Sequence, residues 1–199
     1  MRILTAGAFV AALLALQSVP AQSPGTAAAG ATTHYALDPA KSSLEFTFMQ
    51  AGAANKGRFT RFQVALDFSA ENLAASRLDV TIEMNSTDTG DQERDDTLKG
   101  ADLFAVAKYP QAHFAASQIT RTAAGYEAVG KLTIRGVTHD ARVPFSFRTA
   151  TEAGAAVGYM SGKTSVRRLD YGVGQGDWKA TDQVSNDVTV SFTLRLIAH

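Results

Sequence analysis

Residues 188–196 read Val-Thr-Val-Ser-Phe-Thr-Leu-Arg-Leu, so apolar and polar side chains alternate without a break. Because successive side chains of an extended chain point to opposite faces, this pattern predicts a β-strand with one apolar face. The same alternation occurs in residues 44–48, 62–68, 78–84, 126–134 and 143–147, and more weakly in 112–119 and 156–166. The sequence therefore predicts an all-β protein of about eight antiparallel strands, arranged as a sandwich or a barrel.

A sheet with only one apolar face has to close on itself or pack against a second sheet. A closed barrel of about eight strands has an interior that is either filled by side chains or large enough for one small ligand. Composition leaves both alternatives open. Arg135 and Gly136 predict a hairpin turn, and residues 94–108 have the apolar spacing of a short helix that ends before Tyr109 and Pro110.

The first 33 residues have the composition of a targeting segment and a leader. Residues 1–21 combine an early Arg2, an apolar run and a small-residue site ending at Ala21, which predicts a secretory signal peptide cleaved after Ala21. A membrane anchor is the alternative, but the apolar run is shorter than a bilayer span. Residues 22–33 are almost entirely Ala, Gly, Ser and Thr and predict a flexible leader. The globular domain is then 34–199, exported to the periplasm without a stable membrane anchor.

Charge and cysteine content exclude several classes of function. The 199 residues carry 19 Lys and Arg against 19 Asp and Glu, which gives no basic surface for nucleic acid. With no cysteine, the chain has no disulfide, no thiolate metal site and no catalytic thiol. Any chemistry has to come from histidine, carboxylates, hydroxyls or an apolar cavity.

Several short motifs, in order along the chain, resemble the YceI family of bacterial periplasmic proteins. The motifs are Tyr35-Ala-Leu-Asp-Pro39, Gly57-Arg-Phe59, Ser86-Thr-Asp-Thr89, Arg94-Asp95 with Leu98, Phe104, Tyr109-Pro110, residues 130–138, Arg168 with Asp170-Tyr171-Gly172, residues 174–178, and Val188 with Val190. The resemblance covers roughly residues 35–197. Two positions depart from the family pattern: Gln50 stands where many members have His, and Leu103-Phe104 where many have Phe-Phe.

The resemblance implies an extended, lipocalin-like β-barrel with an apolar interior. Its ligand would be a long amphiphilic lipid of the isoprenoid, quinone-like or fatty-chain type, held without a covalent cofactor. Such a chain gains roughly 0.8 kcal/mol for each methylene that it buries, so it needs no directed polar contact. The family also suggests a homodimer. Gln50 removes any role that the family attaches to the histidine at that position.

Apolar positions with the inward parity of their strands are the candidate pore-lining residues. They are Phe46, Phe48, Phe62, Phe114, Tyr126, Phe145, Phe147 and Tyr159, with Trp178 as a lid or rim residue. Each is also a candidate for an ordinary core side chain. Arg94, Asp95 and Arg168 are candidates for contact with a polar head group at the mouth of the pore; the alternatives are that Arg94 and Asp95 brace a helix start and that Arg168 is a solvated strand end.

No catalytic or metal-binding motif occurs in the sequence. The four histidines lack metal-ligand spacing, and there is no nucleophile elbow, phosphate loop or dinucleotide fingerprint. Binding and carriage of a lipid is thus the leading hypothesis. The alternatives are an enzyme that modifies such a lipid with His113 or His139 as an acid-base group, and a filled barrel with a structural or stress role.

Overall fold

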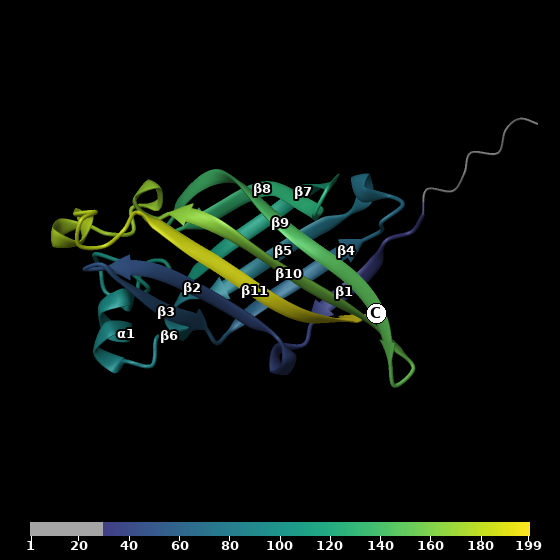
Figure 1. Cartoon of the computed structure of the whole chain (residues 1–199), viewed down its shortest axis with the longest axis horizontal. Coiled ribbons are helices and arrows are strands. Elements are labelled where there is room, and N and C mark those ends of the chain that lie inside the picture. The colour runs from purple at the N-terminus through teal and green to yellow at the C-terminus, as the bar shows by residue number, and fades with distance from the viewer. Residues whose placement is uncertain (1–29) are drawn as a thin grey trace, which may run out of the picture.

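The computed structural model describes residues 30–199, so the expected signal peptide and most of the leader lie outside the described residues. Eight strands form a closed antiparallel barrel in the order β1, β4, β5, β7, β8, β9, β10 and β11, and β11 pairs back with β1 (Figure 1). Their bounds are Thr33–Leu37, Phe62–Phe68, Arg77–Glu83, Gln111–Thr122, Gly125–Ile134, Val137–Glu152, Ala155–Arg167 and Asp187–Ala198. The expected barrel is confirmed.

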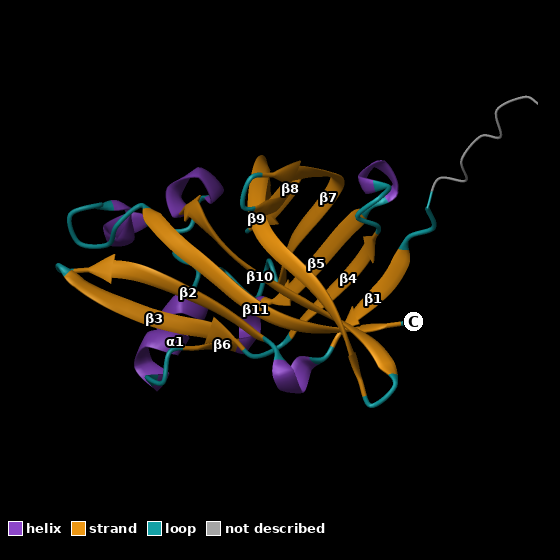
Figure 2. Cartoon of the chain, turned by 45° about the vertical axis from the view of Figure 1, so that its right-hand side comes forward, coloured by secondary structure: helices purple, strands orange, loops and turns teal. Residues whose placement is uncertain are grey.

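Three further strands extend the sheet beyond the ring. β2 (Ser43–Gln50) pairs with the first half of β11, β3 (Ala53–Phe59) pairs with β2, and the short β6 (Thr87–Asp88) pairs with the end of β3. The second half of β11 pairs with β1 on the same edge. The β2–β3 hairpin therefore forms a flap that branches from the barrel wall, beside the end that carries α1 (Figure 2).

The expected helix is shorter than its apolar spacing predicted. α1 spans Gln92–Lys99 and stops at Gly100, and residues 101–108 form turns in which Ala105 has a positive φ. Glycine and the turn conformations that follow it end the helical hydrogen bonding, although the apolar spacing continues. Within residues 30–199, no helix has the length and apolarity needed to cross a membrane.

The turn at Arg135 and Gly136 is confirmed. Ile134 pairs with Val137, and both intervening residues have a positive φ, 51° and 74°. Two positive φ angles give the hairpin turn whose twist matches that of the strands it joins. At this turn β8 ends and β9 begins, at the α1 end of the barrel (Figure 1).

Candidate functional site

An apolar cavity of about 400 Å³ lies between the barrel and the β2–β3 flap. Side chains from the flap and from most strands of the ring line it, among them Leu44, Val64, Val80, Ile82, Leu132 and Leu194. The volume falls in the range of small-molecule pockets, about 300–1,000 Å³. The barrel is therefore not completely filled by its own side chains, and the ligand-holding alternative has the space that it needs.

Four phenylalanines form the flap side of the cavity. Phe46 and Phe48 from β2 have ring centroids 6.1 Å apart, and Phe59 from β3 lies 5.1 Å from Phe46 and 6.2 Å from Phe104. The Phe46 ring lies directly over Gly57 of the neighbouring strand, where a Cβ atom would be only 2.3 Å from the Cζ of Phe46. The missing side chain at Gly57 thus lets the ring lie against β3 and keeps it out of the cavity.

A second group of aromatic rings closes the barrel at the end away from α1. Tyr35, Phe147, Phe68, Tyr126 and Phe145 form a chain in which consecutive ring centroids are 5.3, 4.7, 5.0 and 5.5 Å apart. All five belong to one core cluster or pack against it. Edge-to-face and offset ring contacts of this kind fill space densely. None of the five rings lines the cavity, which therefore lies on the α1 side of this aromatic group.

Polar lining residues gather at the α1 end of the cavity. Gln50 comes from the tip of β2, Arg94 and Thr97 come from α1, and Asp91 and Glu93 come from the start of that helix. No ion pair holds the Arg94 side chain among residues 30–199. The cavity thus has an apolar body and one polar end, which is the arrangement that an amphiphile with a single head group matches.

Asp95 braces the start of α1. It is buried, and its Oδ1 accepts hydrogen bonds from the backbone N and the Oγ1 of Thr89, at 2.8 and 2.7 Å. Asp91 caps the same helix by accepting from the backbone N of Arg94 at 3.1 Å. These bonds fix the position of the helix whose Arg94 and Thr97 border the cavity. Asp95 itself is not on the cavity wall, in keeping with the bracing alternative.

Arg168 lies on the cavity wall and is only 5% exposed. Its Nε, Nη1 and Nη2 donate to the backbone carbonyls of Ser185, Val173 and Val184 at 2.9, 2.9 and 2.7 Å. Burial lowers the pKa of its guanidinium. Within the described chain the guanidinium has carbonyls, not carboxylates, as its partners, so Arg168 is a charged brace inside the loop that follows β10. It is not the solvated strand end that the sequence left as an alternative.

Arg135 joins the two loops that cover this end of the barrel, a role that the sequence analysis missed. Its Nη1 and Nη2 donate to the carbonyls of Gly172 and Ala101, at 2.5 and 2.6 Å. The carbonyl of Asp102 also accepts from the backbone N of Gly174 at 2.9 Å, which ties the same two loops directly. The sequence predicts the turn at Arg135, but a turn pattern does not show which distant carbonyls the side chain contacts.

The two histidines that an enzymatic role would use lie outside the cavity. The Nε2 of His113 contacts Asp79 Oδ2 at 2.8 Å on the outer surface, and the Nε2 of His139 donates to the carbonyl of Asp170 at 3.0 Å. Both residues are exposed, and neither lines the cavity. In residues 30–199 there is also no cluster of three or more His, Asp or Glu side chains suited to a metal. The two histidines therefore offer no acid-base group to a ligand in the cavity.

The structure divides the predicted pore-lining residues into two sets. Phe46, Phe48, Phe62, Phe114 and Trp178 line the cavity, as do Arg94 and Arg168. Tyr126, Phe145 and Phe147 lie in the aromatic closure described above. Tyr159 lies on the opposite face of β10 from the buried Met160, and its hydroxyl donates a hydrogen bond to Glu152 on the outside of the barrel. Among the lining residues that prediction missed are Phe59, Leu98, Phe104 and Val184, which come from β3, from α1 and from loops.

Relatives in solved structures have the same architecture. A Burkholderia cenocepacia protein, BcnA, is 32% identical, with a TM-score of 0.73 over 80% of this chain and 98% of that one. A Campylobacter jejuni YceI protein is 25% identical, with a TM-score of 0.66 over 73% and 85%. A polyisoprenoid binding domain from Saccharophagus degradans is 19% identical, with a TM-score of 0.60 over 83% and 98%, and shares the fold.

Sequence comparison agrees with these structures. A UPF0312 protein of Yersinia pestis (strain Pestoides F) is 40% identical over 82 residues, which is 41% of this chain and 43% of the relative. The matched segment thus spans less than half of that relative's length. The model of the YceI-like domain family matches residues 35–196, which is nearly the whole described chain. The chain therefore belongs to the YceI-like domain family.

Proposed function

We propose that this protein binds one long-chain amphiphilic lipid of the isoprenoid, quinone-like or fatty-chain type, and carries it in the periplasm. The observation that carries the proposal is the apolar cavity with polar side chains at one end. Each methylene that enters it contributes roughly 0.8 kcal/mol, so a long chain gains affinity without hydrogen bonds. The Saccharophagus degradans barrel is a polyisoprenoid binding domain, which agrees with this ligand class.

The ligand's chain would lie along Phe46, Phe48 and Phe114, with its far end toward the aromatic closure. Its head group would lie beside Gln50 and Arg94, where the lining turns polar. The pocket is near the lower end of the usual volume range, which favours a single chain over a two-chain phospholipid.

Two measurements test the proposal. Native mass spectrometry and solvent extraction of protein isolated from its own periplasm should show one bound lipid per barrel. Val80→Phe fills the cavity from β5, whereas Val129→Phe places the same side chain on the other face of β8, next to the buried Ala128. We expect Val80→Phe to lose lipid and Val129→Phe to retain it. A protein without lipid that also fails to take up any single-chain lipid would overturn the proposal.

Export and self-association belong to the same proposal. Deleting residues 1–21 should leave the protein in the cytoplasm, and the exported protein should begin at Gln22, which N-terminal sequencing measures. Sedimentation of the exported protein tests the homodimer that the family resemblance suggests.

A further inference from the structure

The barrel wall contains one stretch where two neighbouring strands run on without pairing. The β9–β10 ladder extends from Glu152 and Ala155 to Phe145 and Gly162, and stops there. Beyond that point residues 137–144 of β9 pair only with β8, and residues 163–167 of β10 pair only with β11. We call the interface between these two unpaired edges the seam; the start of β9 and the end of β10 lie apart in Figure 2.

The sequence at the start of the seam explains why the ladder stops. Pro144 is the next residue of β9, and proline has no N–H to donate to a neighbouring strand. On the opposite strand Gly162 approaches so closely that a Cβ atom would lie 2.4 Å from the carbonyl oxygen of Pro144. Proline inside a strand is found at edges, so this half of β9 has the sequence of an edge strand although it lies in a closed barrel.

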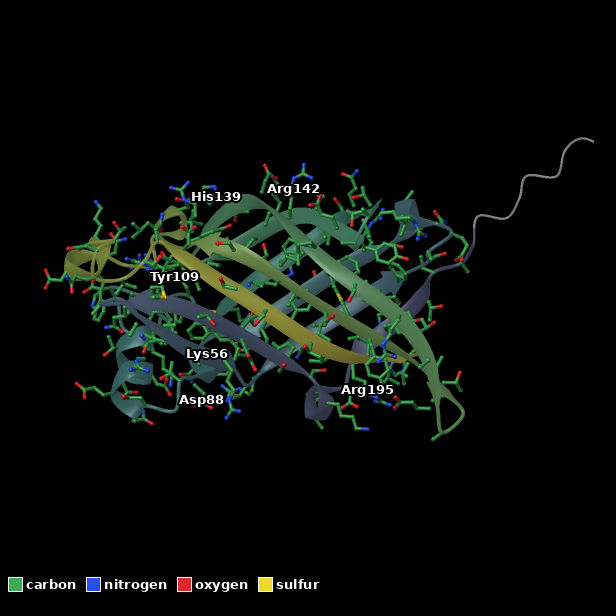
Figure 3. All side chains as sticks on the ribbon, viewed as in Figure 1. Lys56, Asp88, Tyr109, His139, Arg142 and Arg195 are labelled. Atoms are coloured by element: carbon green, nitrogen blue, oxygen red, sulfur yellow. The ribbon has the colours of Figure 1, made fainter. Side chains whose placement is uncertain are left out.

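Side chains, rather than a ladder, close the seam. Thr164 Oγ1 donates to the carbonyl of Arg142 at 3.2 Å, and His139 Nε2 donates to the carbonyl of Asp170 at 3.0 Å. The His139 ring also meets Tyr171 edge-on, with centroids 5.1 Å apart. His139 and Arg142 both lie on the outer surface of this wall (Figure 3). Opening the seam breaks these few contacts and the hydrogen bond from Arg135 to Gly172 at its end, whereas opening any paired part of the wall breaks a series of backbone hydrogen bonds.

The cavity lies directly behind the seam. Val143 from β9 and Thr164 and Val166 from β10 flank the seam on its two sides, and all three line the cavity. A chain that passes between the two strands therefore enters the apolar interior at once. By contrast, the α1 end presents Asp91, Glu93 and Arg94 to an incoming chain, and an apolar chain gains nothing by passing charged groups.

We propose that the ligand's chain enters and leaves sideways through the seam between β9 and β10, with Thr164 and His139 acting as its latch. This inference rests on the proposed function, because it concerns the route to the same cavity. The partner that it implies is a single, flexible apolar chain that can slide in edgewise while its head group stays at the α1 end.

A crosslink across the seam tests the route, and the chain offers a matched control. If the ladder register continued, Arg142 would face Ser165, and both residues are at least partly exposed. Ser146 and Ser161 face each other on the paired part of the same two strands, with Oγ atoms 2.9 Å apart. The chain has no cysteine, so R142C/S165C and S146C/S161C each introduce one pair of thiols. Each pair is joined by oxidation or by dibromobimane, on the outside of the barrel.

The readout is the rate at which each crosslinked protein takes up and releases cis-parinaric acid, a fluorescent single-chain lipid. We expect the seam crosslink to slow both rates by about tenfold or more and to leave the affinity unchanged, because it blocks a route and not a site. The control crosslink should change neither rate. Equal rates in the two crosslinked proteins would overturn side entry and place the route at the α1 end.

A second variant keeps the inference testable if the crosslinked protein fails to fold. Thr164→Val removes the latch hydroxyl and keeps the branched shape, so we expect faster release of the probe. Unchanged release would contradict the latch. If the unmodified protein does not bind the probe or any other single-chain lipid, the proposed function is wrong. If it binds the probe, and the seam crosslink does not change the rates of uptake and release, only the proposed route is wrong.

Discussion

Gly57→Ala should narrow the cavity through the neighbouring Phe46 ring. The added Cβ would lie 2.3, 2.8 and 2.9 Å from three carbons at the tip of that ring. Carbon atoms in contact are about 3.5–4.0 Å apart, so the ring has to move by about 1 Å or more. Overpacking of a core usually costs about 1–3 kcal/mol of the free energy of unfolding. Because Phe46 borders open space, we expect a cost near the lower end of that range.

The displaced ring should affect ligand binding more than stability. If it takes the place of one or two methylenes of the ligand, at about 0.8 kcal/mol each, Kd rises roughly 4- to 15-fold. Denaturant unfolding of the lipid-free protein measures the stability, and titration with parinaric acid measures Kd. In the double variant Gly57→Ala, Phe46→Leu, the smaller side chain should restore much of the affinity.

Gly130→Ala is the control for Gly57→Ala. Its Cβ would lie 2.1 Å from the carbonyl oxygen of Ala115 and 2.5 Å from the Cα of Ala116, which are backbone atoms of the paired β7. These atoms have no space to move into, so we expect Gly130→Ala to lower the free energy of unfolding by about 3 kcal/mol or more. The variant that remains folded should bind the lipid with an unchanged Kd. The reasoning is refuted if Gly57→Ala destabilises the fold as much as Gly130→Ala and leaves Kd unchanged.

Three further predictions concern the frame of the barrel. Hydrogen bonds from Tyr159 and then Arg195 hold the pKa of Glu152 below its ordinary value, so its carboxylate stabilises the fold above that value and stops doing so in acid. Glu152→Gln should therefore unfold more easily than the unmodified protein at pH 7, and this difference should shrink as the pH falls below the ordinary pKa of a glutamate; a constant difference across a pH series of unfolding would contradict this. Arg168→Ala leaves at least two buried carbonyls without a donor and should cost about 2–6 kcal/mol, against less than about 0.5 kcal/mol for the exposed Arg167→Ala, both read from urea unfolding. Gly136→Ala forces a side chain into a φ of 74° and against Tyr109, so its melting temperature should fall; an unchanged temperature would show that the turn relaxes freely.

Much of the barrel could be predicted because a sheet with one apolar and one polar face requires apolar and polar residues to alternate along each strand. Residues 188–196 show this alternation most clearly, and β11 pairs with β10, β2 and β1. β3 was missed because Ala53–Phe59 reads Ala-Ala-Asn-Lys-Gly-Arg-Phe, where small and polar residues hide the period of two. Its pairing with β2, rather than its own composition, makes it a strand.

The candidate site was harder to predict, because periodicity indicates which face a residue occupies and not its position along the barrel. Phe114 and Phe145 have the same inward parity, yet Phe114 borders the cavity while Phe145 lies in the aromatic closure. Tyr159 was predicted to line the pore, but of the two consecutive residues Tyr159 and Met160 it is Met160 that points into the barrel. Arg168 donates to three carbonyls from two separate segments, and such contacts follow only from tertiary structure.

The two halves of β11 have separate structural roles, because one closes the barrel and the other holds the flap. Closure of the ring depends on the second half of β11 and its three-residue register with β1, whereas the first half supports the β2–β3 flap. A longer or shorter flap would change the capacity of the molecule and leave the closing register untouched. Related chains can thus diverge in the size of molecule they accommodate through one hairpin, while the part that holds the fold together stays the same.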